Sequence, residues 1–181
     1  MERHPGGAEA TLRLIELAGI DPPCRVIDLG AGTGEAVRLL RSLGFEALGI
    51  DLAPGADVER GDILDPPFAG GSFDAALCQC SFYLTGAPEL ALIEAARLIR
   101  PGGALLFSDI CPGGEPWLRR AASAAGFDAA ALGDDTENWK RYYINALWRG
   151  EAVPPPKGAR TSDFRYLYAV LIKRRNCDGR I

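Results

Sequence analysis

Apolar side chains recur along the chain with two different periods. Stretches with apolar residues at every third or fourth position, and charged residues between them, predict amphipathic helices. Shorter apolar runs that are bounded by glycine, proline or aspartate are typical of buried strands. The predicted helices cover residues 8–18, 34–43, 88–99, 116–125 and 136–149. The predicted strands cover residues 25–29, 46–51, 57–60, 72–81, 104–110, 127–132 and 166–172.

The order of these elements predicts one α/β domain over residues 1–181. Strands that alternate with helices favour a parallel sheet covered on both faces, and right-handed crossovers then give a doubly wound fold. We therefore expect a mostly parallel, seven-stranded, Rossmann-like sheet flanked by helices. A helical and loop insertion at about 135–163 precedes the last strand, and the run Pro154–Pro156 breaks any helix there.

The most informative segment joins the first predicted strand to the helix that follows it. Residues 28–34 read Asp-Leu-Gly-Ala-Gly-Thr-Gly. Glycine lets the backbone turn tightly and approach a ligand closely. The dinucleotide fingerprint Gly-x-Gly-x-x-Gly is not met, because Glu35 stands where its third glycine belongs. No Gly-Lys-Ser/Thr follows, as a P-loop requires. A nicotinamide-dependent oxidoreductase is therefore a less favoured alternative.

Residues 28–34 resemble motif I of the class I S-adenosylmethionine-dependent methyltransferases. The resemblance covers roughly residues 24–126, because further segments follow in the order of that family. Several motifs in the correct order are more specific than any one of them. These segments are Gly49–Asp51 at the end of the second strand, Gly61–Ile63, Pro67–Phe68 with Ser72–Asp74 before the fourth strand, and Leu98–Gly103 before the fifth.

The resemblance implies S-adenosyl-L-methionine as cofactor, S-adenosyl-L-homocysteine as product and a small molecule as methyl acceptor. A methyl group at either of the first two glycines of the motif would crowd this cofactor. The cofactor-binding residues implied are Asp28, Gly30, Ala31, Gly32, Gly34, Asp51, Leu52, Asp62, Ile63 and Cys78.

Three acidic residues have distinct implied roles. Asp51 lies just past the end of a strand, where doubly wound folds bind ligands, and its carboxylate can accept both ribose hydroxyls. Asp62 would accept from the adenine amino group, while Ile63 packs on the ring. Asp28 would help to hold the loop and the aminoacyl end of the cofactor. The alternative for Asp28 is a structural carboxylate that binds loop amides.

The methyl acceptor is expected near the end of the fourth strand. Cys78 and Cys80 would point to the same face of that strand, and Cys111 ends the neighbouring strand. A cluster of thiols would suit a soft acceptor such as a thiol, a metalloid or a selenium compound. The alternative is that these residues are small buried hydrophobes.

No general base stands out. Tyr83 and Asp109 are the better-placed candidates, and Tyr83, Cys80 and Cys111 are the candidate catalytic residues. His4 is the only histidine, and it is expected at the surface near the start of the chain. Methyl transfer does not always need a base, because positioning alone can supply up to about 7–11 kcal/mol. A non-catalytic cofactor-binding module or a partner-dependent subunit is therefore a second hypothesis.

Three further segments have sequences that allow more than one interpretation. The aromatic stretch Trp139–Trp148 could form a lid, a helix packed on the sheet or a dimer contact. The sequence of Asp65–Phe68 matches a catalytic motif of nucleic-acid amino methyltransferases. However, the segment precedes the fourth strand, so it is interpreted as a turn. The basic run Lys173–Arg175 is interpreted as a solvated strand end.

Charge and composition exclude other classes. The net charge of −4 argues against a broad basic surface, so no nucleic-acid partner is expected. No apolar run reaches the roughly 18 residues of a membrane span, and the start of the chain lacks an apolar signal stretch, so a cytoplasmic protein is expected. The 5 cysteines include no Cys-x-x-Cys pair, so neither a disulfide framework nor a metal site is expected. The oligomeric state is not indicated.

Overall fold

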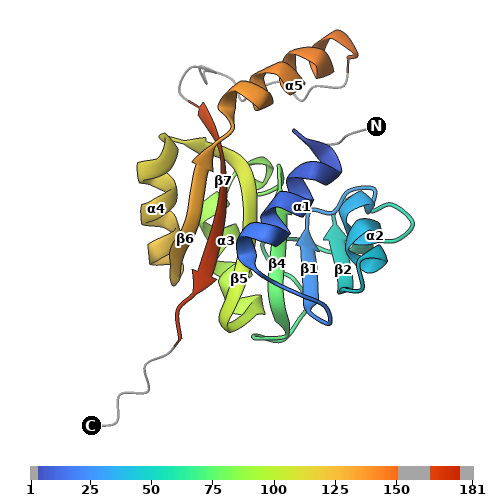
Figure 1. The fold of residues 1–181 in the computed structure, drawn as a ribbon, viewed down its shortest axis with the longest axis vertical. Helices are drawn as coiled ribbons and strands as arrows, with labels where there is room; N and C mark the ends of the chain where they lie inside the picture. The colour runs from blue at the N-terminus through green and yellow to red at the C-terminus, as the bar shows by residue number, and fades with distance from the viewer. Residues whose placement is uncertain (1–3, 151–163, 176–181) are drawn as a thin grey trace.

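The computed structural model describes residues 4–150 and 164–175. In these ranges one 7-stranded sheet has the order β3-β2-β1-β4-β5-β7-β6 (Figure 1). β7 is antiparallel to both of its neighbours, and the pairs on the other side of β5 are parallel. The strands are β1 (Arg25–Leu29), β2 (Glu46–Asp51), β3 (Glu59–Arg60), β4 (Phe73–Gln79), β5 (Ile99–Pro112), β6 (Phe127–Asp134) and β7 (Phe164–Lys173). The doubly wound, mostly parallel fold expected from the sequence is confirmed.

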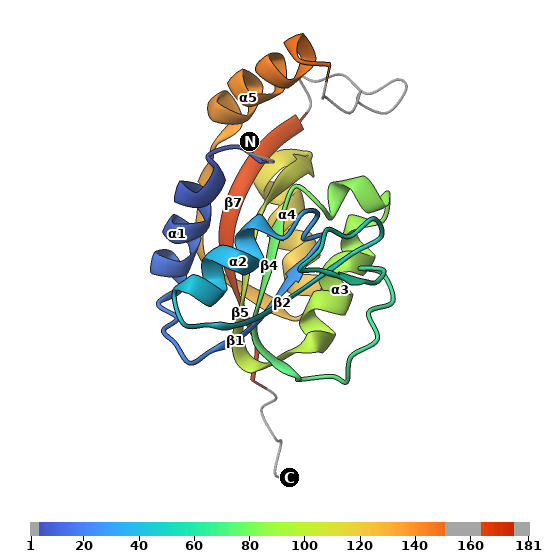
Figure 2. The same cartoon turned by 90° about the vertical axis from the view of Figure 1, so that its right-hand side faces the viewer.

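Helices cover both faces of the sheet. Helices α1 (Gly7–Ala18) and α2 (Glu35–Ser42) lie on one face, and α3 (Pro88–Leu98) and α4 (Gly114–Ala124) lie on the other (Figures 1 and 2). The last helix, α5 (Thr136–Trp148), covers neither face and lies beyond the upper edge of the sheet in Figure 1. None of the helices in the described ranges is long and apolar enough to cross a membrane.

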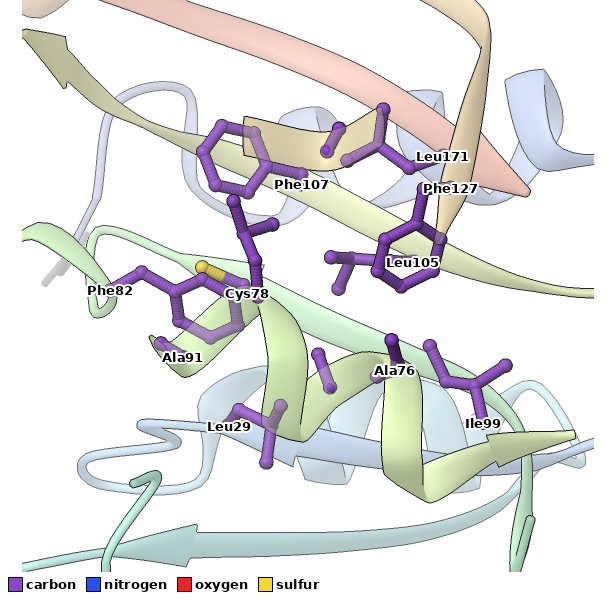
Figure 3. Packing of buried hydrophobic residues seen from close by; sticks show 14 of the residues in the cluster. Leu29, Ala76, Cys78, Phe82, Ala91, Ile99, Leu105, Phe107, Phe127 and Leu171 are labelled. Carbon is purple, nitrogen blue, oxygen red and sulfur yellow. The ribbon is translucent and has the colours of Figure 1, made fainter. Parts of the chain in front are cut away.

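Alternation along the strands divides the core into two layers. Val26 and Leu77 pack in the cluster under α1 and α2, while Ile27 and Cys78 pack in the cluster under α3 and α4. Figure 3 shows the second cluster, in which Phe107 of β5 is one of the fully buried rings. Burial of one such side chain contributes about 1.5–3 kcal/mol. Asp28 alternates with Ile27, so its side chain belongs to the α1 and α2 face.

The ends of the middle strands differ from the expectation. The fourth strand was expected to run to residue 81, but β4 ends at Gln79 and Tyr83–Thr85 form a 3-10 turn. The reason is Cys80, whose φ of 58° is left-handed and breaks the extended backbone. The third strand is limited to Glu59–Arg60.

β5 is longer than expected because it includes the segment Arg100–Gly103, which was expected as a turn. This segment passes close to β4, and the strand register shifts between Phe73 and Ala75. At Gly103 an added Cβ would lie 2.3 Å from the Asp74 carbonyl oxygen and 2.5 Å from Ile99 Cγ2. Only glycine therefore fits where the chain enters the central part of β5.

The ambiguous surface segments have local partners. Arg97 donates to the carbonyl oxygens of Pro66 and Phe68, so the Asp65–Phe68 segment is a loop before β4, as interpreted from the sequence. Lys173 Nζ donates to the Ile99 carbonyl at 2.6 Å, and Arg174 donates to Asp128. The basic run is thus bound to its own sheet and helices. The proline run at 154–156 lies outside the described residues.

We predict that Gly103→Ala lowers the free energy of unfolding by about 1–3 kcal/mol, because the backbone of β4 cannot retreat from the new methyl group. Urea denaturation measures this change. Gly70→Ala is the matched control, because its Cβ would lie 3.3 Å from the Arg97 carbonyl oxygen in an exposed loop. An equal loss in both variants would contradict the packing explanation.

Candidate functional site

The predicted site residues gather at the carboxyl ends of β1, β2 and β4. β1 pairs with β2 on one side and with β4 on the other, so the chain connections leave β1 in opposite directions. Doubly wound sheets bind ligands in the crevice at such a switch point. Two adjoining pockets occupy this edge of the sheet, and both are lined by Gly30 and Cys80.

We call the first the glycine-loop pocket and the second the Asp51 pocket. Their volumes are about 270 Å³ and 240 Å³. Together they fall in the range of roughly 300–1,000 Å³ that is typical of small-molecule sites. The glycine-loop pocket is lined by His4, Asp28, Gly30, Ala31, Gly32, Thr33, Glu35, Ala36, Ala53, Gln79 and Cys80. The Asp51 pocket is lined by Gly30, Asp51, Leu52, Asp62, Ile63, Cys80, Ser81, Leu84 and Thr85.

The glycine loop is held by the end of β2. The amides of Gly30 and Ala31 donate to the Ile50 carbonyl oxygen at 2.9 and 3.0 Å. Asp51 accepts from the Gly32 amide at 2.9 Å through Oδ2 and from the Ala53 amide at 2.8 Å through Oδ1. Each carboxylate oxygen retains acceptor capacity for a ligand hydroxyl. Asp51 therefore shapes the loop and lines a pocket at once.

The glycines of the loop serve different purposes. At Gly30 an added Cβ would lie 2.3 Å from Ser81 Cβ, and at Gly34 it would lie 3.0 Å from Val58 Cγ2. These two positions are therefore constrained by packing within the protein, which the sequence interpretation did not anticipate for Gly30. At Gly32 an added Cβ would meet nothing within 4 Å, although the φ of 52° is left-handed. Gly32 thus leaves open space above the loop.

The Asp51 pocket combines apolar walls with carboxylate oxygens. Asp62 Oδ1 accepts from the Leu64 amide at 2.8 Å, which fixes the turn that presents Ile63. Leu52 and Leu84 contribute exposed side chains, with 63% and 62% of their surface accessible. An apolar slot with acceptor oxygens at its rim suits a flat aromatic ring that carries an amino group.

The glycine-loop pocket contains a buried acid. Asp28 is 4% exposed, and its side chain accepts no hydrogen bond from any described residue. Burial, with a smaller contribution from the charge of Asp51, raises the pKa of Asp28 to about 7. Thr33 Oγ1 in the same pocket is buried without a hydrogen-bond partner among the described residues. These two polar groups favour a ligand with charged or hydrogen-bonding ends in this pocket.

One wall of this pocket depends on residues that the sequence interpretation missed. Gln79 is the last residue of β4, and its amide reaches both Thr11 of α1 and His4. A polar residue at the end of an otherwise apolar strand was the available signal for Gln79. His4 was expected at the surface away from the site, but it is half-buried and lines the pocket. Its position follows from the start of α1 above the strand ends, which no local pattern revealed.

The three cysteines do not form one thiol cluster. Cys78 is buried on the α3 and α4 face, where its thiol donates to Asp109 Oδ2 at 3.7 Å, so its side chain lines neither pocket. Cys111 is fully buried and its thiol bonds the Asp109 carbonyl oxygen. Cys80 lines both pockets, but its left-handed backbone removes it from the face of Cys78. The expectation of a shared face is wrong, because strand alternation ends at Gln79.

Burial keeps these thiols protonated. It raises the pKa values of Cys78, Cys80 and Cys111, and the charge of Asp109 raises them further. In the described ranges no group of three or more His, Cys, Asp or Glu side chains could hold a metal ion. The arrangement therefore favours small buried residues over a ligand set for a soft acceptor.

The two candidate bases also lie outside the pockets. Asp109 is 1% exposed and accepts from the amides of Tyr83 and Ile110 at 3.1 and 2.7 Å. Burial raises its pKa to about 6, although these hydrogen bonds lower it. Tyr83 packs edge-to-face on Phe164 at 5.4 Å, and burial raises its pKa as well. Asp109 therefore anchors the turn after β4, and neither Asp109 nor Tyr83 lines the glycine-loop pocket or the Asp51 pocket.

Helix α5 packs near the turn that follows β4. Trp139 and Tyr143 stack at 5.5 Å and pack with Phe164 and Tyr166 of β7. The same aromatic cluster contacts Cys80 and Tyr83. Of the interpretations of the aromatic segment, a helix packed on the sheet agrees with these contacts, although α5 packs on the end of β7 and lies beyond the two faces that the other helices cover (Figure 2). The lid and the dimer contact stay predictions.

A larger hollow lies elsewhere on the molecule. It has a volume of about 470 Å³ and lies between the start of α4 and strands β6 and β7. Arg165 and Asp134 on its wall form an ion pair at 3.9 Å. None of the residues that the sequence predicted for the site lines this hollow.

Comparisons with known proteins find relatives of this chain and solved structures with its fold. Residues 27–107 match the family described as methyltransferase domain. The malonyl-[acyl-carrier protein] O-methyltransferase of Serratia marcescens is 33% identical over 123 residues, which are 58% of this chain and 48% of that protein. The chain spans about half the length of the curated relatives that it matches first.

Solved structures share the fold. Phosphoethanolamine N-methyltransferase 2 of Haemonchus contortus, in complex with S-adenosyl-L-methionine, superposes with a TM-score of 0.73 at 17% identity, covering 95% of this chain and 54% of that one. The [4+2]-cyclase SpnF superposes with a TM-score of 0.70 at 20% identity, covering 96% of this chain and 84% of that one. Residues 27–107 thus match the methyltransferase domain family, and the motif order and the fold of the chain are similar to those of the class I S-adenosylmethionine-dependent methyltransferases.

Proposed function

We propose that this protein binds S-adenosyl-L-methionine across the two pockets and transfers its methyl group to a small-molecule acceptor. The observation that carries the proposal is the pair of adjoining pockets with different chemistry. One has an apolar slot with carboxylates at its rim, and the other has a buried acid and an unpartnered hydroxyl. These are the complements of a nucleoside and of an amino acid, which are the two ends of this cofactor.

The Asp51 pocket would hold the nucleoside. Asp51 is fixed by two backbone amides, so its remaining lone pairs are oriented before a ligand arrives. They would accept the two ribose hydroxyls. Ile63, Leu52 and Leu84 would pack on the adenine ring, and Asp62 would accept from its amino group.

The glycine-loop pocket would hold the amino-acid end. Ionised Asp28 would pair with the ammonium group, and the Thr33 hydroxyl would gain the partner that it lacks among the described residues. Gly32 leaves the space above the loop open. Gly30 and Cys80 border both pockets, so they mark the place where the two ends of the ligand meet.

When bound, the cofactor supplies a methyl group on a sulfonium, and its transfer to a nucleophile leaves S-adenosyl-L-homocysteine. The residues of the chain would act by binding, orientation and exclusion of water. Positioning of this kind can supply up to about 7–11 kcal/mol. The raised pKa of Cys80 keeps that residue a neutral thiol beside the reacting centre.

A second candidate is a cofactor-binding protein of the same fold that does not transfer methyl groups. The likeness to SpnF, which is described as a [4+2]-cyclase, favours it. The burial of Asp109 and the place of Tyr83 outside the pockets also favour it, because neither expected base reaches a ligand there. Such a protein would bind S-adenosyl-L-homocysteine without turnover of any acceptor.

Calorimetric titration tests the cofactor assignment. We expect the dialysed protein to bind S-adenosyl-L-homocysteine and not NAD. Asp51→Ala should weaken binding at least tenfold, because a charge-assisted hydrogen bond and the shape of the loop are both lost. Asp57→Ala, which removes an exposed acid paired with Arg38 outside both pockets, should bind as the wild type does. No binding by wild-type protein shown to be free of copurified ligand would reject the proposed function.

Asp28→Asn separates a binding role from a structural role. The folded pKa of Asp28 is raised above its ordinary value of 3.8 to about 7, so its contribution to stability is full below about pH 4 and is lost as the pH rises through 7. We predict that Asp28→Asn raises the free energy of unfolding of the ligand-free protein by roughly 1–3 kcal/mol at pH 8, with a smaller gain at pH 5. The same variant should bind S-adenosyl-L-homocysteine about tenfold more weakly.

Urea denaturation at the two pH values and calorimetry measure these effects. Asp65→Asn is the control, because Asp65 is exposed and lines neither pocket. A loss of stability in Asp28→Asn at pH 8 would show instead that the carboxylate is a structural acceptor.

A further inference from the structure

We propose that His4, held by Gln79 and Thr11, binds the carboxylate of the amino-acid end of the cofactor. The inference rests on the proposed function and assigns one specific contact within it. It begins from the charges around the glycine-loop pocket. The lining includes the acids Asp28 and Glu35, and among the described residues His4 is the one lining side chain that can carry positive charge. The acids suit an ammonium group, whereas a carboxylate needs donors.

A relay of hydrogen bonds fixes the orientation of the imidazole. Thr11 Oγ1 donates to Gln79 Oε1 at 2.8 Å, and its distance to the Gly7 carbonyl oxygen is longer, at 3.5 Å. Because its oxygen faces Thr11, the Gln79 amide turns its nitrogen toward His4. Gln79 Nε2 then lies 3.4 Å from His4 Nδ1. Both Thr11 and Gln79 are buried, so this relay is part of the packed structure.

The relay also bears on where the ring carries its proton. Nδ1 of His4 lies 3.4 Å from Gln79 Nε2, which can only donate, and 3.3 Å from the Pro5 carbonyl oxygen, which can only accept. When neutral His4 accepts from Gln79 at Nδ1, its proton is at Nε2. In the cationic ring both nitrogens are donors, and the Pro5 carbonyl oxygen can accept from Nδ1. In these two states Nε2 is a hydrogen-bond donor, which is the chemistry that a carboxylate requires.

The position of His4 in the chain supports this contact. It lies three residues before Gly7, the first residue of α1, and α1 begins at the end of the sheet toward which β1 and β4 point (Figure 1). The glycine-loop pocket is lined by residues at the ends of these strands. Gln79 ends β4, so the relay ties the start of the chain to the central sheet. His4 thus lines the same pocket as Thr33 and the buried Asp28. Gln79 and Thr11 are positioning residues, and His4 is the residue that meets the ligand.

The test uses two ligands that differ at the carboxylate alone, S-adenosyl-L-methionine and decarboxylated S-adenosylmethionine. Calorimetry is done on the full chain. We expect His4→Ala to weaken binding of S-adenosyl-L-methionine about tenfold and to leave binding of the decarboxylated ligand within about twofold. His4→Gln, which keeps an N–H donor, should recover part of the loss. Thr11→Val should show a smaller loss with the same selectivity, and Thr11→Ser should bind as the wild type does.

The outcomes separate the two proposals. If wild-type protein binds neither ligand, the proposed function fails and the assignment of His4 fails with it. If wild-type protein binds both ligands and His4→Ala weakens both equally, His4 supports the fold of the pocket and the inference is overturned. Unchanged affinity for S-adenosyl-L-methionine in His4→Ala overturns it as well. A loss confined to the ligand with a carboxylate supports the inference.

Discussion

The candidate site depends on the hold that the end of β2 has on the glycine loop. The Ile50 carbonyl accepts two consecutive loop amides, and the Asp51 carboxylate accepts a third, from Gly32. Because Leu29 and Ile50 are paired in the parallel register, the loop leaves β1 level with the acceptors that bind it. The shape of both pockets is therefore a consequence of how two adjacent strands pair. A shift of one residue in that register would move the side chains of β2, including the Asp51 carboxylate, to the other face of the sheet.

Asp51, which organises the glycine loop, also makes ionisation of the neighbouring Asp28 less favourable. Asp51 has two backbone donors, whereas Asp28 is buried beside it without a hydrogen bond from any described residue. The ligand-free protein therefore keeps a carboxyl group whose ionisation opposes folding near neutral pH. A cation bound in the glycine-loop pocket would relieve this conflict. A buried carboxylate such as Asp28, with no hydrogen-bond donor among the described residues, is expected where a site is organised to bind a ligand.

The fold could be predicted from the sequence because the spacing of apolar residues, and the glycine, proline and aspartate residues that bound each run, are local properties. The alternation of apolar runs with amphipathic stretches gave the order of strands and helices, and the residues around the glycine motif lie together as expected at the ends of β1 and β2. The turn after β4 was not predictable in this way. Cys80 has a positive φ, and no sequence pattern marks a non-glycine residue for that conformation. The thiol arrangement was wrong for this reason.

Other errors arose where a distant contact decides the role of a residue. Gly30 is constrained by Ser81 of the next strand connection, so its glycine does not by itself report a ligand. His4 reaches the site through Gln79, which is 75 positions away. Asp109 has a suitable chemistry for a base, but the amides of the turn surround it. Contacts of this range depend on the assembled sheet and are not encoded in local spacing.

Different interactions hold the turn after β4 and helix α5 on the sheet. The Cys80 amide donates to the Ser108 carbonyl at 2.9 Å, and Ser81 Oγ donates to the Leu29 carbonyl at 2.5 Å. The turn is thus bound to β5 on one side and to β1 on the other, so these hydrogen bonds attach the floor shared by the two pockets to the sheet. Helix α5 is held mainly by aromatic packing on the end of β7. Substitutions in α5 should therefore alter the far side of the turn, where an acceptor would approach Cys80, without changing the loop that would hold the cofactor.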